Sequence, residues 1–292
     1  MSEIDSTPLA TELQDLARRR TALENRVAPL PAHTRIIAVS NQKGGVGKTT
    51  TAVNMAAALA KMGARVLVID LDPQGNASTA LGIDHHSQIP GTYEVLMGNA
   101  ELDSIVRPNP DNPKLLCAPA TINLAGAEIE LVPASARETR LKRAIDDYLA
   151  RATEAPNYIF IDCPPSLGLL TINALTAANE VFVPIQAEYY ALEGVRMLWD
   201  NISMVQQYLN PKVTITGVLL TMFDSRTNLS REVADEVRRH FPELVLSTVI
   251  PRAVKVSEAP SFQRTVIDHD KDSLGAISYR EAALEFAERG VY

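Results

Sequence analysis

Lys43-Gly44-Gly45-Val46-Gly47-Lys48-Thr49 is the stretch that decides the fold of this chain of 292 residues. It follows a short β-prone run at Arg35–Ser40 and precedes an alanine-rich, helix-like segment at Thr50–Met62. Glycines let backbone N–H groups converge on phosphate oxygens, and the helix that follows presents its positive N-terminus to them. The stretch therefore predicts a phosphate-binding loop between a strand and a helix.

The end of this loop matches the general phosphate-loop pattern G-x-x-x-x-G-K-[ST], but its beginning does not. Counted back from Gly47, the first glycine of that pattern falls on Gln42. Lys48 is expected to place its charge on the β- and γ-phosphates, and the Thr49 hydroxyl is expected to bind Mg²⁺. A glycine-rich turn without phosphate is the alternative, which the Gly-Lys-Thr end disfavours.

Two carboxylates, Asp70 and Asp72, lie at the end of the apolar run Arg65–Asp70. Ligands of open parallel sheets bind at the carboxyl ends of the strands. One carboxylate near Mg²⁺ and one that orients a water would suffice for phosphate hydrolysis. The alternative is that aspartates merely favour the turn after a strand.

Apolar strands alternate with helical stretches along the rest of the chain. Strands that are apolar without alternation are typical of a parallel sheet covered on both faces. We predict one α/β domain over residues 35–292, a P-loop NTPase domain with a mainly parallel twisted sheet. The further predicted strands are Tyr158–Asp162, Glu180–Pro184, Val213–Thr221 and Val245–Ile250, and the further helices are Ser135–Arg151, Leu169–Ala178, Leu192–Leu209, Arg231–His240 and Ala276–Arg289.

Two local patterns refine this prediction. Ser135 with Glu138 forms a capping-box pattern, which places the start of one helix at Ser135. Residues 1–34 form an N-terminal extension, in which Thr11–Val27 could be a short helix that Pro29-Leu30-Pro31 breaks. A frayed arm is the default expectation for this extension, and a partner-binding or dimer-docking helix is the alternative.

The composition restricts the class of protein. No run of eighteen apolar residues occurs, and the polar stretch Met1–Leu16 lacks the apolar core of a signal peptide. Cys117 and Cys163 have no metal-type spacing, so a reduced cytosolic protein is expected. A net charge of −7 argues against general nucleic-acid affinity but leaves room for a local basic patch.

The segment KGGVGKTT at 43–50 resembles the deviant Walker A motif of the ParA/MinD family of P-loop ATPases. The resemblance implies that Lys43 is a signature lysine, which reaches the nucleotide of the opposite subunit in an ATP-sandwiched homodimer. ATP binding and dimerisation would then be thermodynamically linked. The ATP-binding set that it implies is Lys43, Gly44, Gly45, Val46, Gly47, Lys48, Thr49 and Thr50.

The acidic segments resemble the same family. DLDPQGNAS at 70–78 is similar to the switch I region of ParA proteins, which implies that Asp72 positions or activates the attacking water. Asp162 matches the Walker B position and would hold Mg²⁺ through water. Lys43, Lys48 and Asp72 are the catalytic residues that the resemblance implies. Cys163 is interpreted as a packing residue.

Four further motifs resemble the chromosomal ParA (Soj) branch. Pro251-Arg252-Ala253 replaces the Pro-Arg-Asn that often packs on adenine, so Pro251 and Ala253 would contact adenine without a side-chain amide. The DNA-contacting positions of the family fall on Arg226 and on Lys255, where arginine is more usual; Arg238, Arg239 and Arg252 could join them. The motifs are IDCPPSLGLLTINAL (161–175), VPIQAEYYALEGV (183–195), GVLLTMFDSRTNLS (217–230) and VIPRAVKVSEAPSF (249–262).

The resemblance implies a nucleoid-associated, cytoplasmic ATPase for partitioning chromosomes or plasmids. Its ATP-bound dimer would bind double-stranded DNA non-specifically, and a ParB-type partner would stimulate hydrolysis and release it. A MinD-like membrane-cycling ATPase is an alternative, disfavoured because the C-terminal stretch Tyr279–Tyr292 is acidic and lacks lysine, whereas such proteins end in a basic amphipathic helix. A nitrogenase-reductase-like ATPase would need cluster-ligating cysteines. A nucleotide-gated DNA-binding scaffold with incidental turnover is the remaining alternative.

Overall fold

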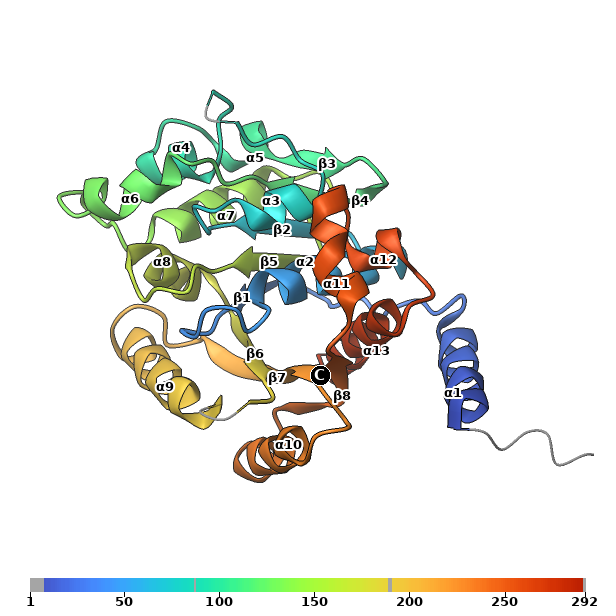
Figure 1. Cartoon of the computed structure of the whole chain (residues 1–292). Coiled ribbons are helices and arrows are strands. Elements are labelled where there is room, and N and C mark those ends of the chain that lie inside the picture. The colour runs from blue at the N-terminus through green and yellow to red at the C-terminus, as the bar shows by residue number, and fades with distance from the viewer. Residues whose placement is uncertain (1–7, 87, 189–190, 291–292) are drawn as a thin grey trace, which may run out of the picture.

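The centre of the molecule is an eight-stranded sheet with the strand order β3-β4-β2-β5-β1-β6-β7-β8 (Figure 1). In this computed structural model, which describes residues 8–86, 88–188 and 191–290, every strand pair is parallel except β3–β4. The predicted mainly parallel sheet is confirmed; residues 1–7 of the extension and 291–292 of the domain lie outside the described residues. The strands are β1 (Arg35–Val39), β2 (Val66–Asp70), β3 (Arg107–Asn109), β4 (Asn112–Ala118), β5 (Tyr158–Asp162), β6 (Glu180–Gln186), β7 (Thr214–Phe223) and β8 (Val245–Pro251).

Helices cover both faces of the sheet, as Figure 1 shows. Alternate residues of β1 enter two separate hydrophobic cores, with Ile37 and Val39 in one and Ile36 and Ala38 in the other. The first core is covered by α2 (Lys48–Lys61), α3 (Asn76–Ala80), α11 (Val254–Glu258), the 3-10 turn Ala259–Phe262, α12 (Val266–His269) and α13 (Leu274–Arg289). The second is covered by α4 (Thr92–Met97), α5 (Leu102–Ile105), α6 (Leu124–Glu130), α7 (Arg140–Arg151), α8 (Leu169–Ala177), α9 (Ala191–Tyr208) and α10 (Asn228–His240).

Helix α2 is buried along almost its whole length. Its alanines at 52, 56, 57, 58 and 60 each expose 3% or less of their surface. Small side chains let the helix lie close to the sheet, so that α2 fixes the loop at its N-terminus. Thr51 N donates to Gly47 O at 2.8 Å, which begins the helix at the end of the glycine-rich stretch.

The hairpin β3–β4 was not predicted from the sequence. Strand β4 pairs in parallel with β2, from Val66 opposite Leu115 to Ile69 opposite Ala118. Its apolar part is short and follows polar turn residues, so periodicity gave no clear signal. The turn residues did offer a sequence signal, because asparagine favours turns. In the structure the Asn109 side chain accepts hydrogen bonds from the backbone N–H groups of Asp111 and Asn112.

The predicted capping box at Ser135 is wrong. Helix α7 begins at Arg140, with Thr139 at the N-cap, and Ala136 has a φ of +51° that no helix interior allows. The N–H of Leu141, in the first turn, has no acceptor within the helix and donates to the Asn173 side chain of α8, at 3.2 Å. Asn173 also donates to the Arg137 carbonyl at 2.8 Å, so a residue distant in sequence does the capping.

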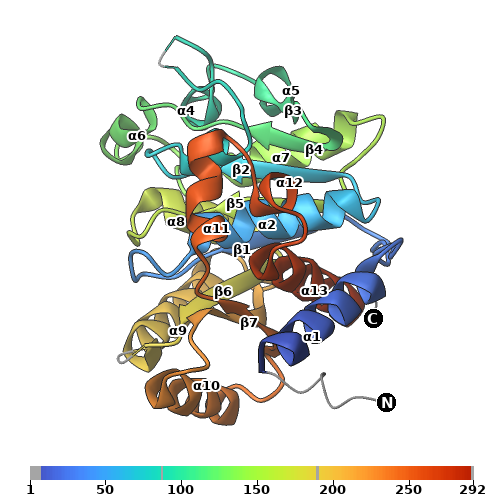
Figure 2. The same cartoon turned by 45° about the vertical axis from the view of Figure 1, so that its right-hand side comes forward.

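Helix α1 (Pro8–Leu23) packs against α13, as Figure 2 shows. The Arg19 guanidinium donates to both carboxylate oxygens of Glu281, at 2.9 and 2.6 Å, and to the Ser278 hydroxyl at 3.0 Å. Arg280 donates in the other direction, to the Leu23 carbonyl at 2.8 Å. This helix is therefore docked on the domain rather than frayed.

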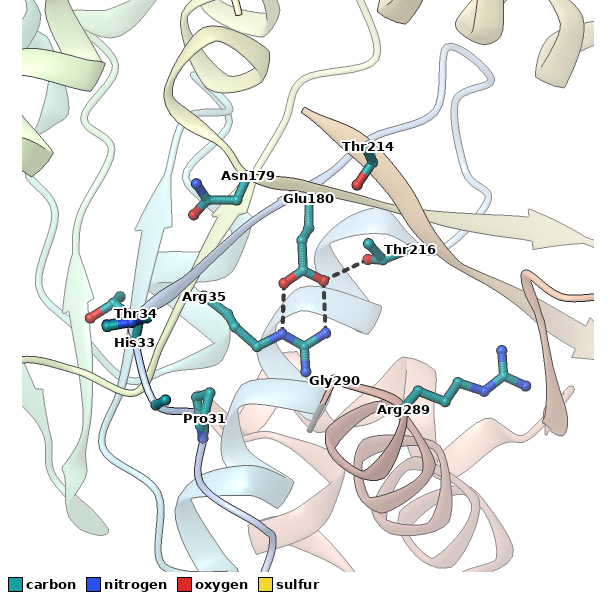
Figure 3. A pocket seen from close by; sticks show the side chains of 11 residues that line it. Pro31, His33, Thr34, Arg35, Asn179, Glu180, Thr214, Thr216, Arg289 and Gly290 are labelled. Atoms are coloured by element: carbon teal, nitrogen blue, oxygen red, sulfur yellow. Dashed lines mark hydrogen bonds and ion pairs between the residues drawn. The ribbon is translucent and has the colours of Figure 1, made fainter. Parts of the chain in front are cut away.

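A cavity of about 490 Å³ opens at the N-terminal edge of the central strands (Figure 3). Arg35 of β1 makes a two-pronged ion pair with Glu180 of β6, at 2.6 and 2.7 Å, and Thr216 of β7 donates to the same carboxylate at 2.6 Å. The Arg35 guanidinium also lies 4.1 Å from the centre of the Phe286 ring. Arg35, Glu180 and Thr216 are paired with one another, so we interpret this cluster as a tie that joins β1, β6, β7 and α13.

We expect Glu180→Gln to lower the free energy of unfolding by about 3 kcal/mol, because it leaves a buried guanidinium without a counter-ion. The Arg35 and Glu180 side chains are only 11% and 12% exposed. Urea unfolding followed by circular dichroism measures the change. Glu101→Gln, which removes the exposed partner of Arg151, is the matched control and should cost less than about 1 kcal/mol. Equal losses in the two variants would contradict this assignment.

Candidate nucleotide site

The carboxyl ends of three neighbouring strands form the floor of the site. Asp162 at the end of β5 lies opposite Val39 of β1 on one side and opposite Asp70 of β2 on the other. The glycine-rich loop leaves β1 at this edge and enters α2. Residues more than a hundred positions apart in the sequence are thus brought together at the place where parallel sheets bind ligands.

The glycine-rich loop is held open by its backbone conformation and by one threonine. Gly45 and Gly47 have φ values of +75° and +89°, which side chains with a Cβ rarely adopt. The Thr221 hydroxyl of β7 donates to the Val46 carbonyl at 2.8 Å and fixes the loop from below. Thr221 was not predicted as a site residue, although it lies within one of the motifs quoted above.

The two lysines of the loop have different surroundings. Lys48 is 7% exposed, and its ammonium donates to the Lys43 carbonyl at 3.2 Å. Burial lowers its pKa, and the carboxylate of Asp162 works in the opposite direction. The Lys43 side chain is 38% exposed and lies 3.8 Å from a Glu188 oxygen. Lys48 therefore faces the interior of the loop, while Lys43 stands at its rim.

Asp162 has the properties of a residue that holds a cation. It is fully buried, and among the described residues neither of its carboxylate oxygens has a hydrogen-bond partner of good geometry. Burial and then the nearby Asp70 raise its pKa well above the usual range, although the neighbouring Thr49 hydroxyl lowers it. A buried carboxylate without a partner is costly, and a hard divalent cation with oxygen ligands would relieve that cost. Thr49 and Asp162 therefore fit Mg²⁺.

The two aspartates that follow β2 differ in how they are bonded. One Asp70 oxygen accepts from the Ser78 backbone and hydroxyl at 2.8 and 2.7 Å, and the other accepts from Asp72 N at 3.2 Å. Burial raises the pKa of Asp70 to about 6. Asp72 is buried, and one of its oxygens accepts from Gln74 N at 3.0 Å. Asp70 thus holds the turn, which leaves Asp72 as the carboxylate available to a water.

A second cavity, of about 280 Å³, adjoins the loop on the other side. Gly47 and Thr50 line it from the loop and α2, and Pro251, the last residue of β8, and Ala253, just after it, line it from the other side. Two residues of the predicted phosphate-binding set thus line the same cavity as the two residues predicted to contact adenine. Met222 and Tyr279 add apolar surface, which suits the face of a purine ring.

The predicted DNA-contacting residues lie on segments that follow neighbouring strands. Arg226 follows β7, and Lys255 follows β8, with Arg252 N donating to the Phe223 carbonyl between them at 3.1 Å. Arg226 is 85% exposed and pairs through two hydrogen bonds with Asp224, which lowers the pKa of that carboxyl to about 2.

Carboxylates also accompany two of the other cations that were predicted to contact DNA. Lys255 pairs with Glu258 at 2.7 Å, and Arg238 pairs with Asp235 at 3.8 Å. The cations were predicted from the sequence but these pairings were not, and the pairings partly neutralise the positive charge.

The chain is similar in sequence to known proteins over most of its length. A family model described as an AAA domain matches residues 34–215. The sporulation initiation inhibitor protein Soj of Bacillus subtilis is 51% identical over 88% of this chain and 99% of its own length. The chromosome partitioning protein ParA of Caulobacter vibrioides is 49% identical over 87% and 94%.

Solved structures of other proteins have the same fold. A Mycobacterium smegmatis protein, described as cobyrinic acid a,c-diamide synthase with bound ADP and magnesium, is 42% identical and has a TM-score of 0.73 over 86% of this chain and 93% of its own. The MinD protein of Pyrococcus horikoshii with Mg-ADP, 24% identical with a TM-score of 0.66 over 88% and 95%, shares the fold. The same Mycobacterium smegmatis protein has also been solved with a bound ATP analogue and magnesium.

Magnesium is expected to increase the affinity for ATP. We expect Asp162→Asn to lower the ratio of ATP affinity with Mg²⁺ to ATP affinity without it at least tenfold, because a neutral amide attracts the cation far less. The free energy of unfolding should stay the same or rise, since the variant removes an unpaired buried charge. ATP titrations with Mg²⁺ and with EDTA measure the first effect, and urea unfolding measures the second. Unchanged Mg²⁺ enhancement in a folded variant would contradict the assignment.

Proposed function

We propose, because this chain belongs to the Soj/ParA family of chromosome-partitioning ATPases, that ATP closes two copies of it into a dimer that binds DNA. Hydrolysis of ATP to ADP and phosphate, stimulated by a ParB-type centromere-binding partner, then releases the DNA. The observation that carries this proposal is the contrast between the two loop lysines. Lys48 is buried beside its own phosphate loop, while the half-exposed Lys43 stands at the rim, where a second copy can receive it.

The roles within one site follow from the surroundings of each group. Lys48 and the backbone N–H groups of the loop bind the phosphates, and Thr49 with Asp162 holds the magnesium ion. Magnesium neutralises phosphate charge when it is bound. Asp72 orients the water, because Asp70 is already engaged by Ser78.

Binding to DNA would use the cations that follow β7 and β8. Arg226 and Lys255 are exposed and contact phosphates without reading base edges, so the binding is independent of sequence. A dimer doubles this surface, which makes DNA binding depend on ATP. The expected location is the cytoplasm, on the nucleoid.

Two other functions are less well supported. A MinD-like cycle needs a helix free to enter a membrane interface. Helix α13 is instead packed in the core through Tyr279, Phe286 and its small residues.

A nucleotide-gated scaffold with incidental turnover would use the same residues. Segregation of chromosome origins in cells that carry Asp72→Ala separates it from the ATPase cycle. Complete failure of that variant supports the cycle, and normal segregation supports the scaffold.

We expect Lys43→Ala to keep ATP affinity within about tenfold but to lose ATP-dependent dimerisation, because the lysine acts across the interface. Size-exclusion chromatography with light scattering, with ATP, ADP and no nucleotide, measures the dimer. Lys48→Ala is the comparison, and it should lose ATP binding itself. A Lys43→Ala dimer that forms with ATP as the unchanged chain does would rule out the role in trans.

DNA co-sedimentation over a salt titration tests the proposed function most directly. With ATP, Arg226→Glu should bind DNA about tenfold more weakly at low salt and lower the salt dependence by about one ion, with basal turnover nearly intact. Asp224→Asn should bind more tightly, since it frees Arg226 from its counter-ion. Arg18→Glu, on an equally exposed arginine of α1, is the control. Equal loss of turnover and DNA binding in Arg226→Glu would contradict the assignment.

A further inference from the structure

One carboxylate, that of Glu188, joins the two sides of the nucleotide site. It follows β6, and one of its oxygens accepts from the Arg252 guanidinium at 3.1 Å and from the Gln186 amide at 2.5 Å. Its other oxygen lies 3.8 Å from the Lys43 ammonium. Lys43 belongs to the rim of the phosphate loop, and Arg252 lines the cavity beside it.

The position of Glu188 is fixed by the backbone around it. Ala187 N donates to the Thr221 carbonyl at 3.2 Å, and the Ser230 hydroxyl donates to the Ala187 carbonyl at 3.2 Å. Thr221 is also the residue that holds the phosphate loop through Val46. The carboxylate is therefore presented at a defined place beside the loop, while its own side chain stays 44% exposed.

The structure shows the Lys43 ammonium turned toward Glu188 of its own subunit, at 3.8 Å. To act in trans, Lys43 must leave this carboxylate. The free energy lost with the ion pair then weakens dimerisation. A half-exposed ion pair shifts an equilibrium by up to about fivefold. Because each copy gives up one pair, a threefold effect per copy becomes about tenfold on the dimer dissociation constant.

We propose that Glu188 is a cis counter-ion that holds Lys43 within its own subunit and so sets the ATP concentration at which the dimer forms. Glu188 does not touch the reacting atoms and acts as a positioning residue through Lys43. The inference rests on the proposed function, in which Lys43 works across the interface. In that function, the Lys43–Glu188 pair would oppose dimerisation at low ATP concentration.

The test is sedimentation velocity of the full chain with Mg²⁺ and a non-hydrolysable ATP analogue. Glu188→Gln keeps the shape and the Gln186 contact but removes the charge, and it should lower the dimer dissociation constant about tenfold. Raising the salt concentration should shrink the difference, because it screens the exposed pair in the unchanged chain. Glu154→Gln, which removes the partner of Arg65 at the opposite edge of the sheet, should change nothing.

The outcomes separate this inference from the proposed function. If the unchanged chain dimerises with the analogue and Glu188→Gln is no tighter, the restraint is wrong and the function stands. If Glu188→Gln is tighter, adding Lys43→Ala should abolish the gain, and a gain that persists would overturn the role through Lys43. A dimer formed by Glu188→Gln but not by the unchanged chain would support the restraint. If neither forms a dimer, both proposals are rejected.

Discussion

The nucleotide site depends on a buried carboxylate that has no partner of its own in the described chain. Asp162 lies beneath the phosphate loop, where burial and the charge of Asp70 both disfavour its ionised form. Such an arrangement is unfavourable for folding, and a cation that arrives with the nucleotide compensates for it. The cost in the isolated chain and the affinity for Mg-ATP therefore have the same origin. Sites that are strained in this way are more often functional than structural.

The sequence was sufficient for six strands of the sheet, β1, β2 and β5–β8, and for the phosphate loop between β1 and α2. Glycines, Lys48 and Thr49 form a contiguous stretch whose chemistry is local, so that their pattern alone predicts the loop. The apolar strands could be read because they are buried on both faces and contain few polar positions. Asp162 was assigned to the site by its resemblance to the Walker B position, and the parallel pairing of β1 with β5 explains why it lies at the strand end from which the loop leaves.

What the sequence did not reveal depends on contacts between distant residues. The start of α7 is decided by Asn173, more than thirty positions away, whereas the local capping-box pattern favoured Ser135. The difference between Asp70 and Asp72 depends on Ser78, whose hydroxyl comes back to the strand end only after the turn has folded. The pairing of Lys43 with Glu188 likewise depends on the order of the strands, because it joins loops after β1 and β6.

Helix α2 limits how the protein can respond to its nucleotide. Its alanines are closely packed against the sheet, so the helix has little room to tilt. The backbone that binds the phosphates is therefore rigid. Discrimination between ATP and ADP must then come from the surrounding segments, which follow β2, β6 and β8 and are tied down by individual polar contacts. Sequence variation that retunes the timing of the cycle should accordingly gather in those three segments and leave the interior of α2 unchanged.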